Sequence, residues 1–206
     1  MKKIFLFFAA VAMTAGVMSA QDINQATEAY NNGAMELQMG NNAAAVENFK
    51  TALTMGEALG DEGADLVANC KKAISSAYLS MAKDLYNAKD FDGAVTAFQQ
   101  AKEVAEGYGE AEIAAEAGEL IGQTEMLKYN TAGKEAMKAK DYPTAIANFS
   151  KVLEMDPANG GVAIQLGQAY MRAGQLDESI AALETAKANG EEENAAKLLS
   201  NIYLKK

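Results

Sequence analysis

Hydrophobic positions recur along this chain with the spacing of an amphipathic helix, and one pattern appears four times. In each copy a small residue is followed by a β-branched residue one position later, a large apolar residue four positions later and an apolar residue seven positions later. Positions spaced in this way share one face of an α-helix. The small residues are Ala45, Ala94, Ala145 and Ser179, and the large ones are Phe49, Phe98, Phe149 and Leu183.

A second set of small residues precedes each of these predicted helices by a constant interval. It stands twelve positions before each small residue of the first set, at Gly33, Ala82, Gly133 and Gly167. Two helices joined by a tight turn would explain the interval, because small side chains let the helices approach while a Phe or Leu fills the space beside them. We also expect Tyr78 and Tyr129, four positions earlier in two of the copies, to pack in the core.

The copies are unevenly spaced. Ala145 and Ser179 are 34 residues apart, whereas the two earlier intervals are 49 and 51 residues. The additional 15 and 17 residues are helical in character, which predicts long helices at about 63–88 and 109–139. A last amphipathic segment at 191–204 predicts a final helix over the apolar face of the fourth copy.

These residues resemble the tetratricopeptide repeat, a helix-turn-helix unit of 34 residues. The third and fourth copies are the most similar, with Met155-Asp156-Pro157 at the end of one and Leu166-Gly167 with Tyr170 in the other. The resemblance implies an all-α fold: an α-solenoid of about four repeats, the first two with lengthened helices, plus a C-terminal capping helix. We place one domain at 21–206, with repeats at about 26–59, 75–108, 126–159 and 160–193 and the cap at 194–206.

The first twenty residues have the pattern of a secretory signal peptide. Lys2 and Lys3 precede an apolar run from Ile4 to about Val17, and we place cleavage after Ala20. The alternative is a retained membrane anchor, but the run is shorter than the roughly 20 apolar residues that a spanning helix needs. We therefore expect an exported protein, periplasmic or secreted, with no membrane span after cleavage. The lone cysteine, Cys70, excludes lipid attachment at that site and is expected to be a buried small hydrophobe.

Charge and composition argue against several functions. Removal of residues 1–20 would leave 16 basic and 28 acidic residues, a net charge of −12 that repels nucleic acid. The chain has no His, which removes imidazole metal sites and His-based catalysis. Its carboxylate clusters, such as Asp61-Glu62, match no calcium loop and are interpreted as solvated surface. We expect no enzyme activity, no catalytic residue, no cofactor and no metal.

The resemblance implies that a concave groove is lined by the first helix of each repeat. None of the residues at the groove positions is acidic, which suggests a peptide partner with acidic groups or a free C-terminus. The alternative is that the lysines are solvated residues on the helix surface with no role in binding. Asn130 and Lys134 have the residue types of a known terminal-carboxylate clamp in reverse order, so that clamp is not predicted. The candidate partner-binding residues are Lys83, Tyr86, Asn87, Asn130, Lys134, Met137, Lys138, Gln168, Met171 and Arg172.

The sequence thus predicts a non-catalytic scaffold or adaptor of the cell envelope that binds a protein or peptide in its groove. One alternative is an accessory protein that binds a small ligand or glycan between the extended helices. A more distant alternative is an enzyme that uses only Asp, Glu, Lys and Tyr. Self-association into a homo-oligomer through the two long helices is also open.

Overall fold

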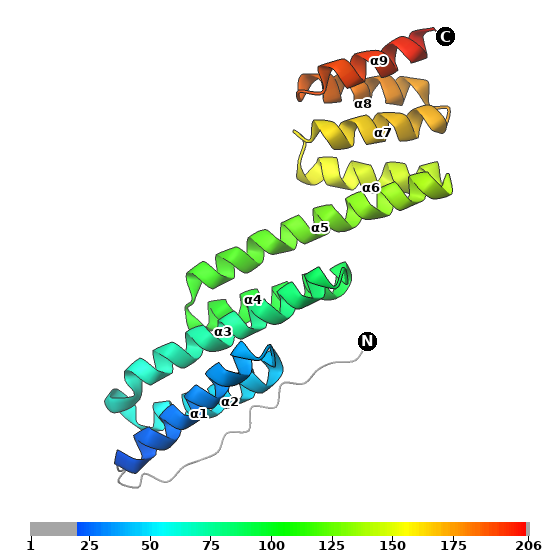
Figure 1. The fold of residues 1–206 in the computed structure, drawn as a ribbon. Helices are drawn as coiled ribbons and strands as arrows, with labels where there is room; N and C mark the ends of the chain where they lie inside the picture. The colour runs from blue at the N-terminus through cyan, green and yellow to red at the C-terminus, as the bar shows by residue number, and fades with distance from the viewer. Residues whose placement is uncertain (1–19, 205–206) are drawn as a thin grey trace. The chain divides into compact units, whose positions relative to one another are not determined.

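The computed structural model describes residues 20–204, which are helical throughout apart from short turns (Figure 1). This confirms the predicted all-α class. The predicted signal peptide lies outside the described residues except for Ala20, where the first helix begins. The elements are α1 (Ala20–Gln38), α2 (Asn42–Ala58), the short 3-10 helix η1 (Gly60–Gly63), α3 (Ala64–Asn87), α4 (Phe91–Tyr108), α5 (Ala111–Ala139), α6 (Tyr142–Met155), α7 (Gly160–Arg172), α8 (Leu176–Ala188) and α9 (Glu192–Tyr203).

The two long helices predicted from the insertions are α3 and α5, and each agrees with its expected range to within two residues. The chain divides into two compact units whose boundary falls inside α3, between Ala73 and Ile74. Both helices remain continuous because their inserted residues are mostly good helix formers. Even Gly118 and Gly122 lie inside α5 without interrupting it.

The first unit is built on the pairing of α1 with α2. A Cβ atom at Gly33 would lie 2.7 Å from Cδ1 of Phe49, so the helices cross where only glycine fits. The ring of Tyr30 packs on the ring of Phe49 with centroids 5.3 Å apart. The end of α2 packs in the same way on η1, where a Cβ at Gly63 would lie 2.0 Å from the carbonyl oxygen of Gly56.

In the second unit α5 packs along successive stretches on two helices. Its first half shares a hydrophobic cluster with α4 through Ala117 and Phe98, whereas its second half receives Phe149 of α6 against Gly133. An insertion of about four to five helical turns separates the stretches, because each turn takes 3.6 residues. The lengthening therefore displaces α6 along α5 relative to α4.

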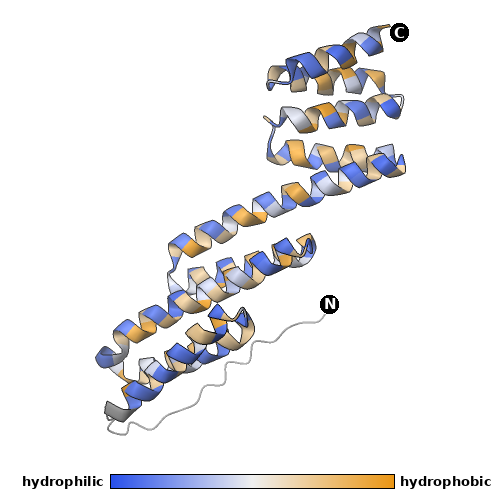
Figure 2. Cartoon of the chain, viewed as in Figure 1, coloured by the Kyte–Doolittle hydropathy of each residue, from blue (hydrophilic) through white to orange (hydrophobic). Residues whose placement is uncertain are grey.

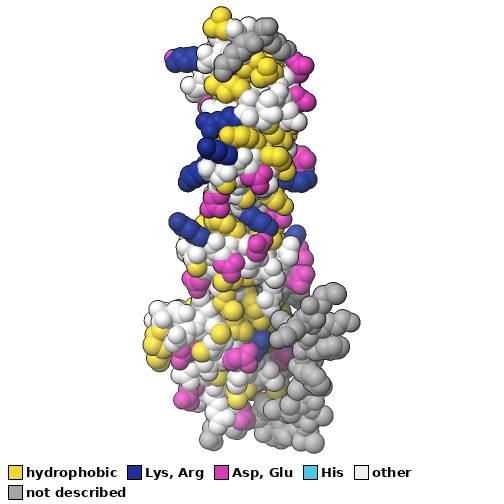
Figure 3. All heavy atoms as spheres, turned by 90° about the vertical axis from the view of Figure 1, so that its right-hand side faces the viewer, with side chains coloured by type: hydrophobic (Ala, Val, Ile, Leu, Met, Phe, Trp, Pro, Cys, Tyr) yellow, Lys and Arg dark blue, Asp and Glu magenta, His cyan; other side chains and the backbone are white. Residues whose placement is uncertain are grey.

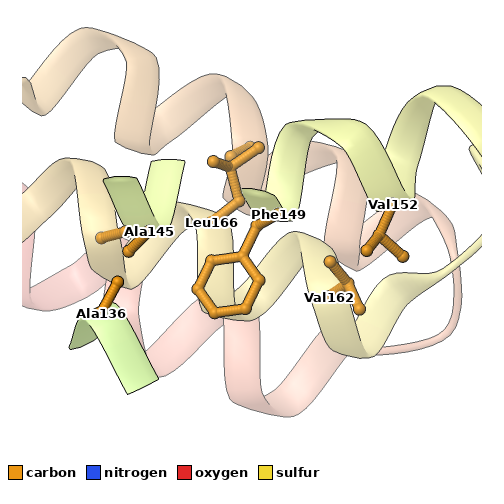
Figure 4. Close-up of a cluster of buried hydrophobic side chains, with 8 residues drawn as sticks. Ala136, Ala145, Phe149, Val152, Val162 and Leu166 are labelled. Atoms are coloured by element: carbon orange, nitrogen blue, oxygen red, sulfur yellow. The ribbon is translucent and has the colours of Figure 1, made fainter. Parts of the chain in front are cut away.

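The last two repeats form the most regular part of the chain. Phe149 lies fully buried among Ala136, Ala145 and Leu166 (Figure 4). Between α7 and α8 a Cβ at Gly167 would lie 2.7 Å from Cγ of Leu183, which repeats the predicted glycine contact.

The predicted capping helix is confirmed as α9. Its apolar residues cover α7 and α8: Ala195 packs with Ala163 and Ala186, while Leu199 and Ile202 pack on Leu183. Ile202 is fully buried. Without α9 these apolar side chains of the fourth repeat would face water.

Every described helix carries hydrophilic as well as hydrophobic residues (Figure 2). Among residues 20–204, no helix combines the length and the apolar character that crossing a bilayer would require.

Candidate partner-binding surface

Three predicted site residues lie on one face near the end of α5. Asn130, Lys134 and Lys138 are spaced by four residues, so they follow one another along the helix. The two lysines are exposed, and Asn130 is half-buried. Because Lys134 and Lys138 are one turn apart, their ammonium groups can reach one ligand together.

Gln168 and Arg172 have the same spacing on α7, with Gln168 half-buried and Arg172 exposed. The two helices belong together, since Ala136 of α5 and Leu166 of α7 share one hydrophobic cluster. We call the five residues Asn130, Lys134, Lys138, Gln168 and Arg172 the basic surface.

The three cations of the basic surface lack internal partners. Among the described residues, neither lysine nor Arg172 takes part in an ion pair. Figure 3, which faces the ends of α5 and α7, shows Lys and Arg side chains gathered beside hydrophobic ones in its upper part. In a chain with a net charge of −10, these unpaired cations are available to an external anion.

Asn130 adds an unused hydrogen-bond acceptor. Its Oδ1 atom is shielded from solvent and has no donor in the described part of the chain. Buried polar atoms are usually paired, so this oxygen is an exception, and a ligand donor can reach it only if the amide group turns towards the surface.

The two predicted methionines serve the core as well as the surface. Met137 packs on the cluster around Phe149, and Met171 packs on the cluster of Leu183, Leu199 and Ile202. Both are half-buried, so each leaves part of a flexible thioether side chain accessible beside the cations.

Lys83 is one of three predicted residues, all on α3, that the structure places away from the basic surface. Its ammonium nitrogen lies 2.7 Å from Oε1 of Glu116 on α5. Glu116 precedes Lys134 by 18 residues of continuous helix, which is about 27 Å along the axis. The expectation of a groove without carboxylates is therefore wrong at Lys83, because the lengthened half of α5 brings Glu116 to it. A signal existed in the sequence: Glu116 follows Lys83 by 33 residues, almost one repeat length.

The other two α3 residues of the predicted set stay with Lys83. Tyr86 packs edge-on against Phe91, with ring centroids 6.1 Å apart, and Asn87 is the exposed last residue of the helix. The structure thus separates Lys83, Tyr86 and Asn87 from the α5 and α7 residues that it brings together.

A second ion pair also involves α5, this time with α4. Lys128 donates to Asp92, and this hydrogen bond holds the pKa of Lys128 above its usual value. Lys128 is therefore committed to an internal partner, unlike Lys134 and Lys138.

An open, shallow hollow lies on α4 and the first part of α5, and so is not formed between the two extended helices α3 and α5. Small side chains line most of it, and its two charged residues, Lys102 and Glu106, lie 3.8 Å apart as an ion pair. It presents no converging polar groups. In the range 20–204 there is no cluster of His, Cys, Asp and Glu suited to a metal ion.

Cys70 is fully buried in α3, as its neighbours predicted. Burial raises the pKa of its thiol to about 11, because the charged thiolate would lose its hydration. A thiol in this state is a poor nucleophile at neutral pH.

The family model described as tetratricopeptide repeat matches residues 136–202, which run from the end of α5 into α9. No match is found among curated proteins.

Several solved structures are similar in fold. The C-terminal TPR-containing domain of an FK506-binding protein from Plasmodium falciparum is 21% identical with a TM-score of 0.40, covering 67% of this chain and 91% of its own. The TPR2AB domain of yeast Sti1, solved as a pHSP90 complex, is 13% identical with a TM-score of 0.37, covering 88% and 84%. MamA from Desulfovibrio magneticus RS-1 is 18% identical with a TM-score of 0.28, covering 87% and 94%.

The helix pairs, their glycine contacts and the capping helix have the arrangement that the repeat requires, and the family model covers the region where the repeats are most regular. Residues 136–202 therefore match the tetratricopeptide-repeat family model.

Proposed function

We propose that this protein is a non-catalytic interaction scaffold of the cell envelope, and that its basic surface binds an acidic segment of a protein partner. The observation that carries the proposal is the group of three unpaired cations on an otherwise acidic chain. Lys134, Lys138 and Arg172 come from two neighbouring helices, and no described carboxylate neutralises them.

The chemistry of the surface suits a short peptide. Lys134 and Lys138 are one helical turn apart, about 6 Å along the axis, and Arg172 lies on α7, which shares the hydrophobic cluster around Phe149 with α5. An extended peptide rises about 3.3 Å per residue, so two residues span the distance between the two lysines. Two or three carboxylates in such a segment could each receive a charge-assisted hydrogen bond.

The remaining residues would orient the bound segment. The half-buried Asn130 can accept a backbone N–H if its Oδ1 turns outward, while the exposed parts of Met137 and Met171 can contact apolar side chains. An amide acceptor beside two lysines favours a peptide over a free inorganic anion, because only the peptide supplies a donor next to its negative charges.

The envelope location rests on the N-terminal pattern. Two lysines, an apolar run and a small residue at Ala20 favour export through a signal peptide. Mass measurement of the protein recovered from the envelope tests this part separately, because a full-length mass would contradict cleavage.

Charge reversal at the basic surface tests the binding site. We expect K134E/K138E to weaken binding of a fluorescein-labelled hexaglutamate peptide at least tenfold in fluorescence anisotropy, since losing two contacts of about 1 kcal/mol each exceeds the 1.4 kcal/mol that a tenfold change requires. The matched control is K72E/K187E, which changes the net charge equally at exposed positions of α3 and α8. Equal affinity of the two variants would refute the proposed site.

A further inference from the structure

One face of α5 is divided by charge into two halves. Its residues recur every three or four positions, which keeps them on one side of the helix. The first half is acidic, the second half is basic, and uncharged residues separate the two. In order they are Glu112, Glu116, Glu119, Gln123, Leu127, Asn130, Lys134 and Lys138.

This face is open to solvent along its length. All eight residues are exposed except Asn130, which is half-buried, and Leu127 keeps 36% of its surface accessible. Only Glu116 among its five charged residues has an ion pair within residues 20–204, and that carboxylate is itself half-exposed.

The charges on this face are complementary to those on the same face of a second copy when the two helices lie antiparallel. If a second copy is laid antiparallel with its centre at residue 125, Glu112 faces Lys138 and Glu116 faces Lys134. The uncharged residues Gln123 and Leu127 then face each other near the centre. Twofold symmetry repeats each contact, which gives four ion pairs around an uncharged middle. This is the contact pattern of an isologous dimer.

We infer that this face of α5 is an interface with a second copy of the same chain. A second copy fits better than an acidic peptide running along the whole face, because Glu112, Glu116 and Glu119 would repel that peptide. Exposed ion pairs are individually weak and are screened by salt. The dimer is therefore a weak one that forms at low ionic strength and dissociates at high salt.

The inference does not depend on the proposed peptide site, although the two share Lys134 and Lys138. A bound second copy covers both lysines with its own carboxylates. Dimerisation and peptide binding therefore compete, and the basic surface is inaccessible to the peptide in the dimer.

Complementary charge reversal on the full chain tests the interface by sedimentation velocity over a range of concentrations. We expect association of the natural sequence at low salt. Each of E112K/E116K and K134E/K138E should raise the dimer dissociation constant at least tenfold, because each makes the face single-signed. An equimolar mixture of the two variants should associate again, and so should the fourfold variant that carries both reversals.

Two results would overturn the inference: a natural sequence that stays monomeric at low salt, or a mixture that associates no better than its separate components. Far-ultraviolet circular dichroism provides the check that both variants keep their helical content. Hexaglutamate binding separates this inference from the proposed function. E112K/E116K should no longer dimerise but should still bind the peptide. If this variant still dimerises, the proposed interface is wrong, whereas the proposed peptide site is unaffected.

Discussion

The contact between Gly133 and Phe149 allows a quantitative test of the repeat packing. A Cβ atom at position 133 would lie 2.6, 2.8 and 2.9 Å from three atoms of the Phe149 ring. The ring cannot turn away freely, since Phe149 is fully buried among other core residues. Replacing Gly133 with Ala must therefore move α6 away from α5 or force the ring off its rotamer.

Two effects of opposite sign act in G133A. Alanine favours a helix interior over glycine by about 1 kcal/mol, and overpacking a core costs about 1 to 3 kcal/mol. The control is G122A in the same helix, where an added Cβ meets nothing within 4 Å. Both variants share the helix-propensity gain. Their difference isolates the clash, and G133A should be less stable than G122A by about 1 to 3 kcal/mol.

Urea unfolding followed by far-ultraviolet circular dichroism measures this difference. We expect G122A to unfold at a higher urea concentration than the natural sequence, and G133A to unfold at a clearly lower concentration than G122A. A second substitution, F149L, should recover part of the loss in G133A because it removes ring atoms from the contact. Equal midpoints for the two alanine variants would refute the packing argument.

Two further predictions concern stability. Asp141 caps α6 by accepting a hydrogen bond from the backbone N–H of Thr144 at 3.2 Å, so D141A should lower the unfolding free energy by about 1 kcal/mol. The control E184Q, at an exposed position inside α8, should change it little, and equal losses would contradict the cap. Cys70 has its pKa raised to about 11 from an ordinary value of 9.0. The stabilisation of the folded chain that comes from burying the neutral thiol is therefore complete below about pH 9. It is lost as the pH rises towards about 11, because the thiol of the unfolded chain ionises first. C70A, compared with the natural sequence in unfolding series from pH 8 to about pH 11, should remove this part of the alkaline loss, and identical pH profiles would contradict it.

Much of this fold follows from spacing within short stretches of sequence. The positions of Ala45, Phe49 and their counterparts indicated the second helix of each repeat, and the twelve-residue interval correctly paired Gly33, Gly133 and Gly167 with the large side chains that fill the gaps beside them. Such patterns are readable because helix periodicity is local and because contacts between adjacent helices recur at a constant interval.

The candidate site was only partly predictable for the same reason. Lys134 and Lys138 share a face whatever surrounds α5, since their spacing alone places them one turn apart. The relation of Lys83 to them depends on which stretch of α5 lies beside α3. The repeat spacing predicted that Lys83 shares a carboxylate-free groove with Lys134 and Lys138. This was wrong because the inserted residues, which include Glu116, were treated as separate from the groove.

The sequence by itself determined the helices, their pairing, the small residues at the crossings and the cation spacing on α5, all of which depend on residues close in the chain or one repeat apart. Only the tertiary structure decided that Lys83 pairs with Glu116 and that Lys134, Lys138 and Arg172 have no ion-pair partner within residues 20–204. Those facts depend on how far α5 extends before α6 packs on it. A lengthened helix keeps its own periodicity but packs on different neighbours. Local sequence patterns indicate the periodicity and not the neighbours.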